Sequence, residues 1–111
     1  MPLNDASRNI MNRETFAKMK KGAFLINTAR GALVDEEALV EALDNGTVAG
    51  FATDVLVEEP FNMAHPLMGR EDVVLTPHIA WGPQATRARL LQICADNLEA
   101  FLKGTSLNRL V

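Results

Sequence analysis

The sequence is short of several residue types, and each shortage narrows what the protein can do. Cys94 is the only cysteine among 111 residues, so the chain can form no internal disulfide and no cysteine cluster for zinc. A single cysteine fits a reducing compartment, and we expect the protein in the cytoplasm. No apolar run is long enough to cross a bilayer, and residues 1–12 lack the apolar segment of a signal peptide. We therefore expect no membrane partner.

The sequence also has fewer basic than acidic residues. Lys and Arg number 11 against 14 Asp and Glu, which gives a formal net charge of -3. A surface that binds nucleic acid is basic, so we expect no nucleic-acid partner. What the chain does have is a 48% share of hydrophobic residues, which is enough to form a core. A chain of this length fits one small domain and leaves no room for two.

Hydrophobic spacing predicts three helices. Asn12 is expected to cap a helix that runs through Phe16 and Met19, and Asp35 to cap a second helix that Asn45-Gly46 closes. A long helix is expected over residues 83–103, because apolar residues repeat there at helical spacing. The apolar face of this long helix comprises Leu90, Leu91, Cys94, Leu98, Phe101 and Leu102.

Three short, nearly continuous apolar runs predict strands that are buried on both faces. They cover residues 23–28, 48–53 and 73–76. Strands that alternate with helices indicate a parallel sheet with right-handed crossovers, and so an α/β fold. Parallel sheets of this kind bind ligands outside the carboxyl ends of their strands. The residues that follow each strand are therefore the candidates for a functional site.

Side chains that can bind a ligand or transfer a proton follow all three predicted strands. Arg30 comes after the first strand, Asp54 and the Glu58-Glu59 pair come after the second, and His78 comes after the third. Taken alone, each has an ordinary explanation: an exposed loop arginine, a solvated acidic loop and a packed histidine. Together they suit the reduction of a carbonyl group in a substrate that also carries a carboxylate. Arginine can hold a substrate carboxylate with two parallel hydrogen bonds, and histidine can pass a proton to a carbonyl oxygen.

The rest of this chemistry needs two further groups. A carboxylate beside the histidine would stabilise its charged form and fix its ring. The hydride that reduces the carbonyl carbon must come from a cofactor, since no side chain can supply it. The second histidine, His65, lies in a loop before Pro66 and away from any predicted strand end, so we interpret it as structural.

Four segments of the sequence resemble the D-isomer-specific 2-hydroxyacid dehydrogenases, and the resemblance runs almost from end to end. These segments are Met19–Gly31 (MKKGAFLINTARG), Val34–Leu39 (VDEEAL), Asp54-Val55-Leu56 followed by Glu59-Pro60, and Thr76–Trp81 (TPHIAW). The resemblance implies an NAD(P)-dependent oxidoreductase that transfers a hydride between nicotinamide and a small 2-hydroxy or 2-oxo acid. Trp81 is similar to the residue found in the glycerate and hydroxypyruvate reductase branch.

The resemblance also implies roles for individual residues. Arg30 would bind the substrate carboxylate, His78 would be the general acid or base, and Glu59 would pair with His78. Glu59 is preferred to Glu58 because it stands immediately before the proline. The cofactor, NAD or NADP, would be contacted by Pro2, Ser7, Thr28, Ala29, Arg30, Asp54, His78 and Ala80.

As to organisation, residues 1–82 would be the C-terminal half of a Rossmann-like NAD(P)-binding domain. Residues 83–111 would be a helical segment that packs back on the substrate domain. None of the seven glycines is spaced as G-x-G-x-x-G, the pattern that binds the cofactor pyrophosphate. The family carries this motif in an upstream half that is not present here. NAD and NADP are therefore not distinguished, and the isolated chain is expected to be incomplete.

Three hypotheses follow. In the first, the chain is an enzyme segment that is active when an N-terminal half is supplied. In the second, it is a truncated, non-catalytic oligomeric or regulatory module. In the third, it is an unrelated α/β binding domain, which the three residues at strand ends disfavour. We also expect self-association through the open edge of the first strand or through exposed helix faces.

Overall fold

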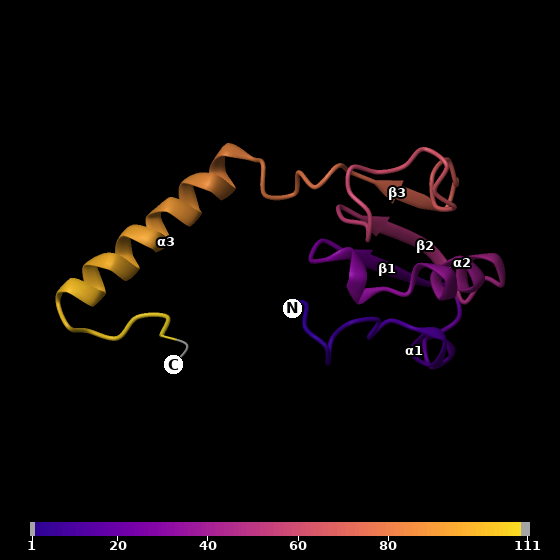
Figure 1. Ribbon diagram of the computed structural model, residues 1–111, viewed down its shortest axis with the longest axis horizontal. Helices are drawn as coiled ribbons and strands as arrows, with labels where there is room; N and C mark the ends of the chain where they lie inside the picture. The colour runs from indigo at the N-terminus through magenta and orange to yellow at the C-terminus, as the bar shows by residue number, and fades with distance from the viewer. Residues whose placement is uncertain (1, 110–111) are drawn as a thin grey trace. The chain divides into compact units, whose positions relative to one another are not determined.

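The protein divides into two units, which are described separately. The computed structural model describes residues 2–109. The first unit extends to Ile79 and contains all the strands, and the second begins at Ala80 and contains one long helix (Figure 1).

The first unit is built on a parallel sheet. Its strands are β1 (Ala23–Asn27), β2 (Val48–Thr53) and β3 (Val73–Leu75). They lie in the order β1-β2-β3, and both pairings are parallel (Figure 1). The predicted parallel sheet is thus confirmed, although β1 and β3 each end one residue earlier than the sequence suggested. In a parallel sheet all carboxyl ends meet at one edge, so the loops after the three strands share that edge.

Two helices belong to this unit, and their caps follow from the sequence. Helix α1 (Arg13–Ala17) begins after Asn12, whose side chain accepts hydrogen bonds from backbone N–H groups of the first turn. Helix α2 (Glu36–Asp44) begins after Asp35, whose carboxylate accepts the Ala38 N–H at 3.1 Å. These caps satisfy donors that a helix start leaves unpaired. The prediction that α1 reaches Met19 was wrong.

The early end of α1 has a local cause. The N–H of Lys18 donates to the carbonyl of Thr15, which is one residue closer than an α-helical bond, and this tighter turn ends the helix. Met19 still packs against the core, because its side chain extends from that turn. A short 3-10 helix, η1 (Gly31–Leu33), follows the loop after β1.

The hydrophobic core lies between the helices and one face of the sheet. Phe16 of α1, Leu39 of α2 and Phe51 of β2 all belong to it, and Leu39 is fully buried. Leu67, in the loop between β2 and β3, is also fully buried and holds that loop against the core. Complete burial of such a side chain contributes about 1.5–3 kcal/mol. This core fixes β2 and the loop that follows it.

The opposite face of the sheet is exposed, so the prediction of strands buried on both faces was wrong. Phe24 and Ile26 of β1 are 76% and 71% exposed, and Val74 of β3 is 64% exposed. Successive residues of a strand point to opposite faces, and the core of this unit forms against one face only. The apolar run predicted the strands correctly, but the elements that would bury its second face are not among the described residues of this unit.

The second unit contains α3 (Gln84–Leu102), which confirms the predicted long helix. Gly104, with φ of 67°, follows its end. None of the helix residues is buried, and Leu91, Phe101 and Leu102 are all more than 70% exposed. No helix among the described residues is both long enough and apolar enough to span a membrane. The apolar face that the sequence predicts is therefore present on this helix.

Candidate active site

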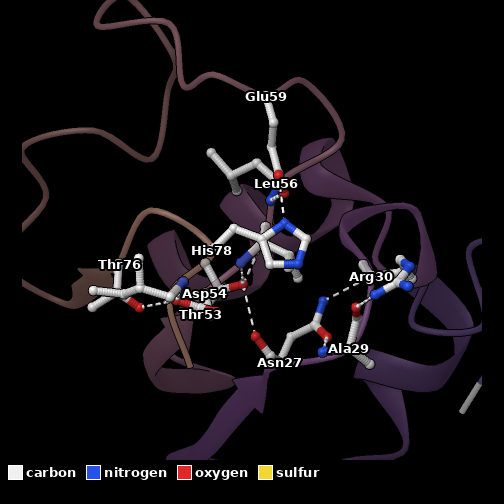
Figure 2. Close-up of polar contacts among 11 residues, drawn as sticks. Asn27, Ala29, Arg30, Thr53, Asp54, Leu56, Glu59, Thr76 and His78 are labelled. Atoms are coloured by element: carbon white, nitrogen blue, oxygen red, sulfur yellow. Dashed lines mark hydrogen bonds and ion pairs between the residues drawn. The ribbon is translucent and has the colours of Figure 1, made fainter. Parts of the chain in front are cut away.

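A buried asparagine shapes the loop after β1. Asn27, the last residue of β1, is 7% exposed. Its side-chain amide donates to the carbonyl of Arg30 at 2.9 Å, and its side-chain oxygen accepts the N–H of Ala29 at 3.0 Å. A buried polar side chain is stable only when it is hydrogen-bonded, and Asn27 meets this need by folding residues 28–30 back over the strand end. The loop that carries Arg30 is thus held from below (Figure 2).

Asp54 fastens the loop after β3 to the end of β2. Its side chain is buried, and Oδ1 accepts hydrogen bonds from the hydroxyl of Thr76 at 2.5 Å and the N–H of Ile79 at 2.9 Å. Its backbone carbonyl accepts the N–H of His78 at 2.9 Å. Three contacts from one residue therefore fix the segment on both sides of His78 (Figure 2).

The backbone of His78 needs this support. Its φ of 55° lies in the left-handed region, which is uncommon for any residue other than glycine. Such a conformation costs on the order of 1–3 kcal/mol and persists only where its surroundings enforce it. The contacts of Asp54 enforce it here. The consequence is that the imidazole turns toward the loop that follows β2.

In that loop the imidazole meets Glu59. Nδ1 of His78 lies 2.7 Å from Oε2 of Glu59 (Figure 2). The other carboxylate oxygen of Glu59 accepts the N–H of Leu56 at 3.2 Å, so both oxygens are engaged. This contact directs Nε2 to the side of the ring away from the carboxylate. The imidazole is 43% exposed and so remains accessible to a ligand.

Arg30 comes from the loop after β1, at the same edge of the sheet. Its side chain is exposed, and Nη1 donates to the carbonyl of Ala29 at 2.6 Å. Arginine has five donors, so this bond leaves others for a ligand. The structure thus brings Glu59 and His78 into direct contact and places Arg30 on the neighbouring loop.

Only some of the residues predicted to contact the cofactor lie together. Pro2, Thr28, Ala29 and Arg30 line one pocket of about 630 Å³ together with Leu3. These residues come from two separate segments, and their contact with a cofactor stays a prediction. Ala80 belongs to the second unit, and its contact with a cofactor stays a prediction.

Ser7 was expected to contact the cofactor, but its side chain serves the N-terminal loop. It is 6% exposed, and its hydroxyl donates to the carbonyl of Pro2 at 2.9 Å while accepting the N–H of Asn4 at 2.8 Å. Ser7 therefore shapes the turn that carries Pro2. A contact between Ser7 and a cofactor stays a prediction.

Two ion pairs perturb acidic groups elsewhere in the first unit. The guanidinium of Arg70 donates two hydrogen bonds to Asp72, at 2.8 and 2.9 Å, and holds the pKa of that carboxyl below its usual range. The guanidinium of Arg13 likewise lowers the pKa of Glu41. Asp72 directly precedes β3, so the Arg70 pair lies at the end of the strand opposite to His78.

The sequence interpretation missed three residues that build the site. Asn27, Gly31 and Glu36 hold its loops but carry none of the groups expected to react. A polar residue at the end of an apolar run could have pointed to Asn27. Gly31 and Glu36 act through contacts with residues more than 20 positions away, and no local pattern marks such contacts.

Comparison with known proteins identifies the family to which this chain belongs. The chain matches the family model described as D-isomer specific 2-hydroxyacid dehydrogenase, NAD binding domain, over residues 1–80. The chain belongs to this family. The match confirms the resemblance found in the sequence, the α/β dinucleotide-binding fold and the NAD(P) class of cofactor.

Individual relatives agree. The chain is 44% identical over 107 residues to a hydroxypyruvate reductase of Blautia hydrogenotrophica, and the aligned region covers 96% of this chain and 33% of that protein. It is 49% identical over 104 residues to a glyoxylate reductase of Thermofilum pendens, covering 94% and 31%. The chain thus spans about a third of the length of these curated relatives.

Solved structures share the fold. The crystal structure of a D-isomer specific 2-hydroxyacid dehydrogenase from Xanthobacter autotrophicus, in complex with NADPH and MES, matches with a TM-score of 0.78 and 35% identity, covering 97% of this chain and 44% of that one. A Lactobacillus delbrueckii dehydrogenase of the same family, in an NAD-complexed form, matches with a TM-score of 0.75 and 32% identity, covering 97% and 37%.

Proposed function

We propose that this chain supplies the catalytic residues of an NAD(P)-dependent reductase of small 2-oxo acids, acting together with a part that completes the dinucleotide site. The observation that carries the proposal is the contact of 2.7 Å between His78 and Glu59, at the same sheet edge as the loop of Arg30. Glyoxylate and hydroxypyruvate are the substrates we favour, because the two curated relatives bear the names of their reductases.

The proton would come from His78. In the reduction of a 2-oxo acid, the carbonyl oxygen gains one proton and the carbonyl carbon gains a hydride. The Nε2–H of His78 donates that proton, and the same nitrogen accepts it back in the reverse oxidation. Glu59 accepts the Nδ1–H, which fixes the ring so that Nε2 faces the substrate and stabilises the charged imidazolium. A bound nicotinamide supplies or takes the hydride.

Arg30 would hold the substrate. Its guanidinium can grip a carboxylate with two parallel hydrogen bonds, and a remaining donor can polarise the neighbouring carbonyl. Binding both groups would set the carbonyl oxygen toward His78. Arg30 thereby selects 2-oxo acids over simple aldehydes and ketones, which have no carboxylate to bind.

The cofactor would lie in the pocket beside Arg30. Thr28 and Ala29 would line it through their backbone, and Pro2 from the opposite segment. Asp54 would lie near the nicotinamide carboxamide, and Ala80 would also contact the cofactor. We further propose a cytoplasmic location, and that residues 83–111 pack on the substrate domain of the assembled protein.

The assay follows the oxidation of NADH and of NADPH by absorbance, with glyoxylate, hydroxypyruvate, pyruvate and phenylpyruvate as substrates. It is run on the chain alone and on the assembled enzyme, meaning this chain with the N-terminal part of such a dehydrogenase added, fused or in trans. We expect turnover in the assembled enzyme. Absence of turnover with every substrate and both cofactors, in a folded assembly, would contradict the proposal.

A non-catalytic oligomeric module is the second candidate, and the exposed sheet face favours it. In this candidate, a second copy of the chain covers Phe24 and Ile26. Sedimentation at rising concentration should show self-association that a Phe24→Ser, Ile26→Lys double variant reduces. Met63→Ser is the control, since Met63 is equally exposed but lies in the loop after β2. Association without turnover in any assembly would favour this candidate.

A further inference from the structure

Glu36, the first residue of α2, uses both oxygens of its carboxylate. Oε1 accepts the N–H of Val57 at 3.0 Å, and Oε2 lies 3.1 Å from Nε2 of His65. The side chain is only 20% exposed. We infer that Glu36 is a positioning residue, held by His65, that sets the carboxylate of Glu59 against His78. This inference rests on the proposed function.

His65 orients Glu36 through a defined proton arrangement. Nδ1 of His65 accepts the N–H of Leu67 at 3.3 Å, so this nitrogen carries no proton. A neutral imidazole then carries its proton on Nε2, which donates to Oε2 of Glu36. His65 is 14% exposed and lies beside the fully buried Leu67. The histidine therefore anchors one oxygen of Glu36 to the core and leaves the other directed at Val57.

The contact with Val57 connects Glu36 to the candidate catalytic pair. The N–H of Leu56 binds Oε1 of Glu59 at 3.2 Å, and the next N–H along the chain, that of Val57, binds Glu36. The two carboxylates thus hold consecutive amides of one short segment. Oε2 of Glu59 contacts His78. A shift of this segment would move the Leu56 N–H that holds Glu59, and with it the oxygen that faces His78.

An acidic residue at a helix start also has a general role, because it interacts favourably with the helix dipole. The neighbouring Glu37 provides the comparison that separates the two roles. It lies in the same first turn of α2 and carries the same charge, but its side chain is exposed. Removing the charge of Glu37 changes the dipole interaction and leaves the contacts of Glu36 in place.

The test compares Glu36→Gln and Glu36→Ala with Glu37→Gln. In Glu36→Gln, the side-chain NH2 group must face either the N–H of Val57 or the Nε2–H of His65. One of the two contacts is therefore lost, while the size of the side chain is kept. We expect kcat of the assembled enzyme to fall roughly tenfold in Glu36→Gln, because small misplacements of reacting groups are costly. The KM for NAD(P)H should stay unchanged, and Glu37→Gln should match the wild type. In the chain itself, amide hydrogen exchange at Val57 should become faster in Glu36→Ala, which removes both contacts.

Equal kcat values in folded Glu36→Gln and Glu37→Gln would overturn the inference, as would unchanged exchange at Val57 in Glu36→Ala. If Glu36→Ala does not fold, Glu36→Gln decides alone. If the wild-type assembly has no turnover, the proposed function fails separately. Exchange at Val57 then decides whether Glu36 holds this segment: faster exchange supports the positioning and unchanged exchange overturns it.

Discussion

Gly31 lies directly against the backbone of Leu56. A β-carbon at residue 31 would stand 2.0 Å from the carbonyl carbon of Leu56 and 2.4 Å from the nitrogen of Val57, and real β-carbons do not approach backbone atoms so closely. The residue after Arg30 must therefore be a glycine for the loop of Arg30 to meet the loop of Glu59. Two loops that follow different strands are joined at this point.

Gly31→Ala should push these loops apart. We expect a loss of about 1–3 kcal/mol in the free energy of unfolding, because the added carbon overpacks a site made of backbone. Turnover of the assembled enzyme should fall as well. Chemical denaturation and the NAD(P)H assay measure the two effects.

Gly50→Ala is the matched control for that substitution. Its β-carbon would meet the ring of Phe24 at 2.9 Å, but this ring is exposed and can rotate away. Gly50→Ala should therefore cost less stability than Gly31→Ala and leave turnover intact. A larger loss of stability in Gly50→Ala than in Gly31→Ala would contradict the close approach of Gly31 to Leu56.

Arg30→Lys should weaken the use of 2-oxo acids although the charge is kept. A lysine ammonium cannot reproduce two parallel hydrogen bonds. The loss of one charge-assisted bond is worth about 1.5–3 kcal/mol, or roughly 10- to 150-fold in kcat/KM for the substrate. Steady-state kinetics measure this, with Arg13→Lys in helix α1 as control. A wild-type kcat/KM in Arg30→Lys would remove the carboxylate-binding role.

The Arg70–Asp72 pair should make stability depend on acid pH. The pKa of Asp72 is lowered in the folded chain by its hydrogen bonds to Arg70, so the pair stabilises the fold above the ordinary aspartate value of about 3.9. That contribution is lost as the pH falls through the lower, folded value. Asp72→Asn should reduce the free energy of unfolding at pH 7 by less than about 1 kcal/mol, and the difference from wild type should vanish in strong acid.

Urea denaturation at several pH values measures this dependence. Glu71→Gln is the control, since it removes a charge from the exposed residue next to Asp72. A difference between Asp72→Asn and wild type that stays constant down to the lowest pH would contradict the linkage.

The sequence predicted the elements that depend on local patterns. The caps at Asn12 and Asp35, the three parallel strands and the long helix α3 all appear, because capping chemistry and hydrophobic spacing act over a few residues. The meeting of three loops at one sheet edge followed from the parallel order alone. The resemblance to the dehydrogenase family implied that Glu59, rather than Glu58, pairs with His78, and the structure brings Glu59 into contact with that histidine.

The sequence could not predict what depends on three-dimensional contacts. Phe24 and Ile26 belong to an apolar run whether or not something covers them, so their exposure was not foreseen. The left-handed backbone of His78 results from the hydrogen bonds of Asp54, a residue 24 positions earlier. His65 was expected to be structural, and its contact with Glu36 gives that expectation a specific partner.

The most direct test of the account is the turnover of His78→Ala in the assembled enzyme, with Glu59→Gln and its neighbour Glu58→Gln measured beside it. In His78→Ala, kcat should fall roughly 10²- to 10⁴-fold, as is typical for loss of a general acid. Glu59→Gln should also lower kcat, and Glu58→Gln should not. Near wild-type turnover in His78→Ala, or equal effects at Glu58 and Glu59, would contradict the account.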